Sequence, residues 1–177
     1  MIILMGVAGA GKSMQGKILA DEHGFAWIST GEILRVLVTG KRRQEMLEGK
    51  LLSDEEMINL MDKVLELIDA KEEFVLDGFP RTVPQADWLL AQVKDGRFPL
   101  SAIVHLTASE EVVRSRLLER GRQDDTEEAI AKRFNEYRNS TLPILEYLHK
   151  AGGKVCDIDA AQDPRAVHDA ILQCLDI

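Results

Sequence analysis

The sequence predicts an α/β fold built around a parallel β-sheet. Five short runs along the chain are almost entirely apolar, as is typical of parallel strands that helices cover on both faces. These runs are Ile2–Met5, Phe25–Ser29, Phe74–Asp77, Ala102–Leu106 and Lys154–Ile158. The segments between them have helical periodicity, and strands that alternate with helices are joined by right-handed crossovers.

One predicted helix is especially clear. Residues Asp54–Ile68 place their apolar side chains on one face, and Ser53 with Glu56 forms the sequence pattern of a capping box. The wider stretch Glu32–Ile68 has room for two or three helices between the second and third strands. The same capping pattern is expected to begin two later helices, at Thr107 with Glu110 and at Asp125 with Glu128.

Two prolines mark boundaries among the helices of the C-terminal half. A long helical pattern covers Glu127–Lys150, and Pro143 is expected to kink or break it because proline has no backbone N–H to donate. Pro164 suits the first turn of a final helix over Arg165–Leu175, where that missing donor costs little.

Length, charge and composition fit a single domain over residues 1–177. The chain is 45% hydrophobic and 29% charged, which suits one compact unit. A net charge of −8 argues against a nucleic-acid partner, because nucleic-acid-binding domains are usually basic. No apolar run approaches about 18 residues, and the N-terminus has no charged region or cleavage site. We therefore expect a cytoplasmic monomer that neither spans nor binds a membrane.

The cysteines and histidines show no metal-binding pattern. Cys156 and Cys174 form no CxxC pair, so we expect neither a disulfide framework nor a structural zinc ion, and we interpret both as small core residues. The histidines are scattered without the spacing of metal ligands, and no ligand role is expected for them. They are His23, His105, His149 and His168.

Residues Gly6–Ser13 match the complete phosphate-binding loop G-x-x-x-x-G-K-[ST]. Its glycines let several backbone N–H groups turn toward one anion, and the positive end of the following helix faces the same anion. Lys12 can reach the terminal phosphates, and Ser13 can bind Mg²⁺. The motif needs a strand before it and a helix after it, and Met1–Met5 and Met14–Ala20 meet these conditions. The chain is therefore expected to bind a nucleoside triphosphate.

Charged residues follow the second and third predicted strands. Ligands of open α/β sheets lie beyond the carboxyl ends of the strands, and Arg35 and Asp77 fall there. A guanidinium at Arg35 can form a forked contact with a second phosphate, and a carboxylate at Asp77 can orient Mg²⁺ and its waters. The turn made by Gly78 and Pro80 is expected to hold Arg81 in place nearby.

Two further features address the acceptor and the transferred group. The amide of Gln85 can donate to and accept from a base edge at once. Arginines are frequent later in the chain, where several guanidiniums can stabilise the charge that spreads over three oxygens during phosphoryl transfer. They are Arg116, Arg120, Arg122, Arg133 and Arg138, of which Arg122 lies in a short polar connector where a lid would lie.

The chain resembles the adenylate kinases of the nucleoside monophosphate kinase family. The resemblance rests on the phosphate loop with Gln15 and on the segments ISTGEILR, GKLLSDEEM, VLDGFPRTVPQA, RLLERGRQDDTEEAIAKRFNEY and TLPILEYL, which span nearly the whole chain in family order. It implies a P-loop NTPase fold of three layers, α/β/α, with a five-stranded parallel sheet. It also implies a small helical NMP-binding insert at residues 30–60 and a very short lid at 119–126.

The resemblance also implies a reaction and a role for each site residue. The γ-phosphoryl group of MgATP would pass directly to AMP, giving two ADP. The residues around the transferred phosphoryl group would be Lys12, Arg81, Arg122 and Arg133. The ATP site would comprise Gly9, Ala10, Gly11, Lys12, Ser13, Met14 and Arg116. The AMP site would comprise Thr30, Arg35, Leu52, Gly78, Arg81 and Gln85. The residues for Mg²⁺, partly through water, would be Ser13 and Asp77.

The chain departs from the family pattern at three places. Ser13-Met14 replaces the usual Gly-Thr after the lysine, so Ser13 is expected to touch Mg²⁺ more directly than is usual. The insert between Arg35 and Gly49 and the connector Gly121–Gln123 are both short, and the connector has no cysteines for zinc. We expect weaker exclusion of water and faster opening than in relatives with long lids.

Two rival interpretations remain at this point. The first is a kinase of the same class with another acceptor, such as CMP, UMP or a small alcohol, which the shortened insert leaves open. The second is a nucleotide-binding module without catalysis, which predicts loss of Lys12, Arg81 or Arg122. All three are present.

Overall fold

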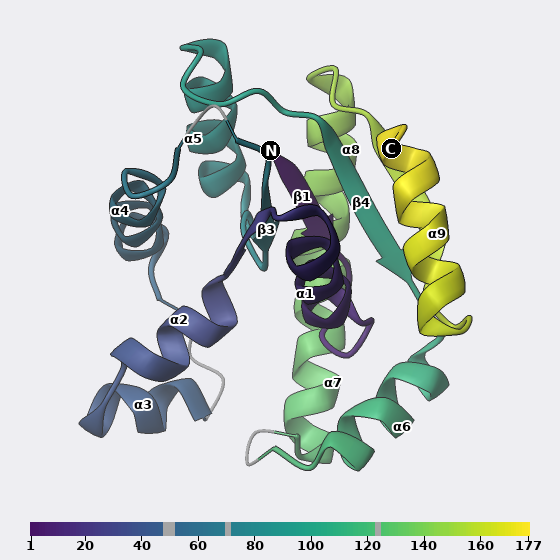
Figure 1. Cartoon of the computed structure of the whole chain (residues 1–177). Helices are drawn as coiled ribbons and strands as arrows, with labels where there is room; N and C mark the ends of the chain where they lie inside the picture. Colours follow the sequence, from purple (N-terminus) through teal and green to yellow (C-terminus); the bar gives the residue numbers. More distant parts are fainter. Residues whose placement is uncertain (48–51, 70–71, 123–124) are drawn as a thin grey trace.

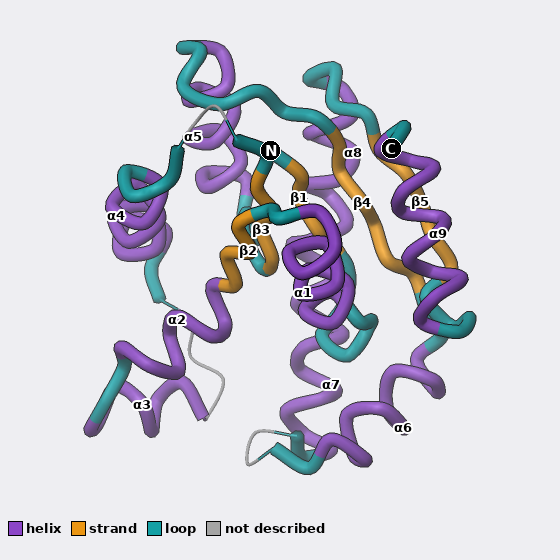
Figure 2. The backbone as a smooth tube through the Cα atoms, viewed as in Figure 1, coloured by secondary structure: helices purple, strands orange, loops and turns teal. Residues whose placement is uncertain are grey.

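The structure is a computed structural model that describes residues 1–47, 52–69, 72–122 and 125–177. Within these residues, five parallel strands form one sheet in the order β2-β3-β1-β4-β5. The strands are β1 (Ile2–Met5), β2 (Ala26–Ser29), β3 (Phe74–Asp77), β4 (Ala102–Thr107) and β5 (Val155–Asp159), drawn in orange in Figure 2. The predicted strands are confirmed, with no end displaced by more than one residue.

Helices cover both faces of the sheet, which gives the predicted three layers (Figure 1). Alternate residues of β1 point to opposite faces. Ile3 packs with the helices α4 (Asp54–Leu65), α5 (Val83–Lys94) and α8 (Leu142–Lys150). Leu4 packs with the helices of the other face, namely α1 (Lys12–His23), α6 (Glu110–Arg120), α7 (Glu127–Glu136) and α9 (Pro164–Leu175). Burial on both faces explains why the central strands are apolar at nearly every position.

The predicted insert contains helices rather than strands. α2 (Thr30–Leu37), α3 (Gly40–Leu47) and α4 follow one another between β2 and β3. At the start of α4, the Ser53 hydroxyl accepts from the Glu56 N–H at 3.2 Å, and the Glu56 carboxylate accepts from the Ser53 N–H at 2.9 Å. This capping box is confirmed. Two residues of the short segments predicted here, Gly49 and Gln123, lie outside the described residues.

The two other predicted capping pairs are wrong by one or two residues. β4 continues through Thr107, whose hydroxyl donates to the Ile158 carbonyl oxygen at 3.2 Å, so Ser109 caps α6 instead. Thr126 caps α7, because the carboxylate of Asp125 is held by arginines. In both cases a tertiary contact decides which oxygen is free to cap a helix.

The prediction for Pro164 is confirmed, whereas the helical chain before Pro143 changes to a π-helical segment and does not break. The long helical pattern of the C-terminal half divides into α7, a π-helical segment η1 (Tyr137–Thr141) and α8, and Pro143 lies in the first turn of α8. Pro164 is the first residue of α9, which Asp163 caps. Of the described helices, none is long and apolar enough to cross a membrane.

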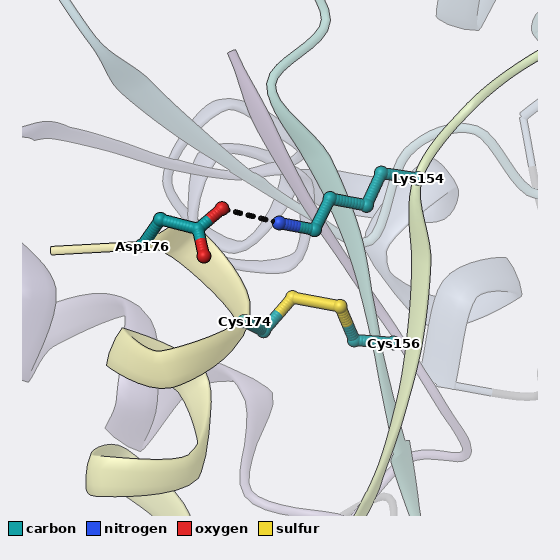
Figure 3. Close-up of a disulfide and its surroundings, with 4 residues drawn as sticks. All are labelled: Lys154, Cys156, Cys174 and Asp176. Carbon is teal, nitrogen blue, oxygen red and sulfur yellow. Dashed lines mark hydrogen bonds and ion pairs between the residues drawn. A yellow bond between two sulfur atoms is a disulfide. The ribbon is translucent and has the colours of Figure 1, made fainter.

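The prediction about the two cysteines is wrong. Cys156 of β5 and Cys174 of α9 form a disulfide bond, with their Cα atoms 6.3 Å apart (Figure 3). An ion pair of 2.6 Å between Lys154 and Asp176 lies beside it. The final helix folds back along the edge strand, and this return brings together two cysteines that no sequence motif connects. Cys174 is also a buried core residue, as predicted.

Candidate active site

The phosphate loop connects the end of β1 to the start of α1, as the motif requires. Gly6 has a φ of 139°, and a Cβ atom there would lie 2.4 Å from the carbonyl oxygen of Leu106. Only glycine fits such a position. The Lys12 ammonium group reaches back across the loop and donates to the carbonyl oxygens of Gly6 at 2.7 Å and Val7 at 2.9 Å.

Lys12 lies among cations, and this environment lowers its pKa from 10.5 to about 8. Burial is the largest cause, because it disfavours the charged form. Nearby Arg81, Arg120 and Arg133 lower the pKa further, while Asp77 raises it. The loop therefore holds positive charge that a polyphosphate would stabilise.

Ser13 and Asp77 meet at the same end of the sheet. Asp77 is the last residue of β3, which pairs with β1, and it is 4% exposed. The Ser13 hydroxyl donates to Asp77 Oδ2 at 2.6 Å. A hydroxyl and a carboxylate are oxygen ligands of the kind that Mg²⁺ takes, so these two residues fit the predicted magnesium site.

A cavity of about 730 Å³ opens over the carboxyl ends of the strands. The insert helices lie on one side of it, and α6 and α7 lie on the other (Figure 1). Most of the predicted site residues line it: Gly9, Ala10, Gly11, Lys12, Ser13, Met14, Arg35, Leu52, Asp77, Arg81, Gln85, Arg116, Arg122 and Arg133. The structure thus brings both predicted halves of the site to one cavity.

Thr30 and Gly78 are the predicted site residues that do not line this cavity. The Thr30 hydroxyl donates to the Gly78 carbonyl oxygen at 3.0 Å. Arg81 Nε donates to the same oxygen at 2.8 Å. A Cβ atom on Gly78 would lie 2.6 Å from the Thr30 hydroxyl, so glycine allows this close packing. Both residues act here as the support of Arg81.

The Gln85 side chain, which was predicted to contact a base edge, forms two hydrogen bonds within the protein. Its side-chain oxygen accepts from the Arg81 backbone N–H at 2.8 Å, and its NH₂ group donates to Asp54 at 2.8 Å. The amide still has one unused hydrogen and one unused lone pair in these contacts. Gln85 thus links α4 to the turn that carries Arg81.

Arg120 and Asp125 form a support that the sequence analysis did not identify. Arg120 donates twice to the Asp125 carboxylate, at 2.6 and 2.9 Å, and Arg133 donates to it at 2.9 Å. Burial raises the pKa of Asp125, but the hydrogen bonds from the two arginines outweigh burial and the net shift is downward. One buried carboxylate therefore orients two arginines of the cavity wall. The only signal in the sequence is Asp125 itself, whose spacing from Glu128 predicts a helix cap instead.

Comparisons with known proteins match this geometry. A family model described as adenylate kinase matches residues 4–153. The adenylate kinase of Corynebacterium urealyticum is 38% identical over 181 residues, covering 99% of this chain and 98% of the relative. The adenylate kinase of Nitrobacter hamburgensis is 39% identical over 174 residues, covering 89% and 83%. Adenylate kinase 1 of a Nostoc species is 40% identical over 152 residues, covering 82% and 83%.

The chain belongs to the adenylate kinase family. It is a phosphotransferase of the ATP:AMP class with the P-loop NTPase fold, and membership of the family implies binding of ATP, ADP and AMP. Adenylate kinases use MgATP as a general matter. Acceptors such as CMP or UMP are not favoured, and a module without catalysis is not favoured either.

Adenylate kinases bind two anionic substrates. In this chain, the acidic residue Glu32 lies between two of the arginines that are predicted to bind phosphate, Arg35 and Arg122. Glu32 Oε1 accepts from Arg35 at 2.6 Å and from Arg122 at 3.4 Å. The hydrogen bond from Arg35 is the largest cause of a lowered pKa at Glu32. The carboxylate therefore bridges an arginine of α2 and an arginine of the segment that follows α6, with all three side chains partly exposed.

Proposed function

We propose that this adenylate kinase aligns MgATP on the phosphate loop and AMP beneath the insert helices, and transfers the γ-phosphoryl group directly between them. The proposal rests on one observation: positively charged side chains from the phosphate loop and from the acceptor side line the same cavity. These cations all line the cavity: Lys12, Arg35, Arg81, Arg122 and Arg133. We assign Lys12 to the donor, Arg35 and Arg81 to the acceptor, and Arg122 and Arg133 to the phosphoryl group that passes between them.

On the donor side, backbone N–H groups of the loop bind the phosphates. These come from Gly9, Ala10, Gly11 and Met14, with the start of α1 directed at the same anion. Arg116 lies at the adenine end, where its guanidinium donates to the Ala160 carbonyl oxygen at 2.8 Å and presents a flat face to the base. Ser13 and Asp77 would hold the Mg²⁺ of MgATP, partly through water, and such an ion would supply positive charge against the phosphates.

On the acceptor side, Arg35 and Arg81 bind the phosphate of AMP. The phosphate would replace Glu32 as the partner of Arg35. Arg81 is already oriented, because its Nε donates to Gly78. The backbone of Leu52 and the side chain of Gln85 would lie beside the adenine, because both residues line the cavity. Thr30 would support this side of the site through its hydrogen bond to Gly78.

The transfer needs no covalent intermediate with the protein. An oxygen of the AMP phosphate bonds to the γ-phosphorus as the bond from that phosphorus to the β–γ bridging oxygen breaks. Both products are therefore ADP. Lys12, Arg122 and Arg133 neutralise the charge that develops on the three equatorial oxygens, and the alignment of two bound anions supplies the remaining rate enhancement.

We also propose that residues 30–60 act as the AMP-binding insert and 119–126 as a reduced lid. The protein would work as a monomer in the cytoplasm, without nucleic-acid or membrane partners. The proposed insert and lid rest on family membership and on the helices between β2 and β3, of which α2 and α4 line the cavity.

An assay of ADP formation with AMP, CMP, UMP and GMP as acceptors tests the proposed specificity. We expect AMP to give by far the highest kcat/KM. Equal turnover with a pyrimidine nucleotide would contradict the assigned adenine site. Absence of turnover with every acceptor, despite ATP binding, would contradict catalysis itself.

A further inference from the structure

Three candidate metal ligands come together where α1 ends and α9 begins. Both helices lie on the same face of the sheet (Figure 1). Glu22 and His23 are the last two residues of α1, and His168 lies in the first half of α9. One ligand atom from each residue lies within 4.8 Å of the others. None of the three residues lines the nucleotide cavity, but Gln15, which contacts His168, does.

Hydrogen bonds around His168 determine which ring nitrogen can bind a cation. The Gln15 side chain donates from Nε2 to the Pro164 carbonyl oxygen at 2.9 Å, so its Oε1 faces the imidazole. That oxygen lies 3.3 Å from His168 Nδ1. An acceptor at this position requires the proton on Nδ1, and Nε2 of the neutral ring then carries a lone pair.

Nε2 of His168 is buried next to a carboxylate. His168 is 1% exposed, and its Nε2 has no hydrogen-bond partner among the residues that the structure describes. The nearest oxygen of Glu22 is 3.4 Å away. A lone pair and a carboxylate oxygen repel each other unless a cation lies between them.

We propose that Glu22, His23 and His168 form a site for a transition-metal ion of the Zn²⁺ class. Two imidazoles and one carboxylate are ligands that zinc takes, with water in the fourth position. Ligand atoms of a tetrahedral zinc site lie about 3.3 Å apart, so the present separations need to contract. Glu22 and His23 are exposed at the helix end, where Arg165 binds Glu22 and the ring of His23 stacks on Phe25. The contraction would therefore move these two side chains toward the buried His168.

Two neighbouring residues orient the ligands of this site. Gln15 holds the ring of His168, and Arg165 donates to Glu22 Oε1 at 2.5 Å, which leaves Oε2 directed at His168. Outer partners of this kind are usual around metal ligands. The nitrogen ligands also separate this site from the one for Mg²⁺, which prefers oxygen ligands throughout.

Isothermal titration of the full chain with ZnCl₂, after treatment with EDTA and in a large excess of Mg²⁺, tests the proposal. We expect one ion per chain. His23→Gln and Glu22→Gln, both at exposed positions, are each expected to weaken binding at least about tenfold. His149→Gln changes an exposed histidine on α8 and is the matched control, with unchanged affinity expected. At an ion concentration of about 100 Kd, the melting temperature is expected to rise by about 5–10 °C.

Absence of saturable binding would overturn the proposal. The proposal would also be overturned if His23→Gln and Glu22→Gln bound Zn²⁺ as tightly as the unmodified protein, or if His149→Gln lost Zn²⁺ binding. Co²⁺ provides a second readout, because a tetrahedral site gives visible absorption bands. We expect these bands in the unmodified protein and not in His168→Gln, with circular dichroism used to confirm that this variant is folded. Bands that persist in folded His168→Gln would contradict the buried ligand.

Discussion

In the candidate active site, charged neighbours determine the orientation of individual side chains. Glu32 is an example, because its carboxylate lies where two arginines would otherwise face each other. A phosphate has the same charge sign and a similar arrangement of oxygens, so it is the natural competitor for Arg35. We therefore expect the Glu32 carboxylate to orient Arg35 and Arg122 in the free protein, and to be displaced from Arg35 when the substrate phosphate binds.

The lowered pKa of Lys12 predicts a pH dependence of ATP binding. Bound phosphates favour the ammonium form, so affinity is fully present below pH 8 and falls as the pH rises through about 8. Folding stability has the opposite trend. Because the unfolded chain retains the proton up to about 10.5, the contribution of Lys12 to stability rises between these two values.

Titration of ATP between about pH 7 and 9.5 measures this effect, and the loss is expected to approach tenfold per pH unit. Lys12→Met is the control, since its weaker binding should lose this dependence. Affinity that stays constant across the range in the unmodified protein would contradict the assignment.

At the residue scale, the sequence predicted which residues belong to the candidate site better than it predicted the contacts that these residues make. The loop, Ser13 and Asp77 could be identified because their motif specifies both spacing and structural context. Asp125 could not, since its partners Arg120 and Arg133 come from two different helices. Gln85 was identified as a site residue, but its bond to Asp54 depends on the packing of α4 against α5.

At the scale of elements, hydrophobic patterning predicted the strands and their number, while tertiary contacts decided the ends of helices. The capping box at Ser53 was predictable because both of its partners lie within one turn. The caps at Ser109 and Thr126 were not, because they depend on how far β4 extends and on where Asp125 is held. Patterning also did not pair Cys156 with Cys174.

The short connector between α6 and α7 predicts some hydrolysis of ATP in the absence of AMP. A reduced lid shields the γ-phosphoryl group less completely, so water can act as acceptor. The ratio of phosphate release without AMP to ADP formation with AMP measures this leak, which we expect to be detectable. Lys12→Met should abolish it and so assign it to this site. A negligible ratio would show that closure is complete despite the short connector.

At the scale of the whole molecule, the disulfide bond joins the last strand to the last helix. It closes a loop with a sequence separation of 18 residues, and closure of a loop of this size stabilises a protein by about 3 kcal/mol. Reduction is therefore expected to lower the melting temperature by about 6–12 °C.

Thermal unfolding with and without a thiol reductant measures that difference, after a thiol count has confirmed the oxidised state. The Cys156→Ser, Cys174→Ser double variant should be insensitive to reductant. An unchanged melting temperature on full reduction would mean that packing of α9 alone determines the stability of this edge.

The alignment of two nucleotides in one cavity is tested most directly by Arg81→Ala. Binding of ATP, measured by titration, should change little, because the phosphate loop is untouched. The kcat/KM for AMP is expected to fall about 100-fold or more, as it does when one charged donor to a reacting phosphate is removed. Arg114→Ala removes an exposed arginine outside the cavity and should leave both quantities unchanged. Unchanged use of AMP by Arg81→Ala would contradict the placement of the acceptor.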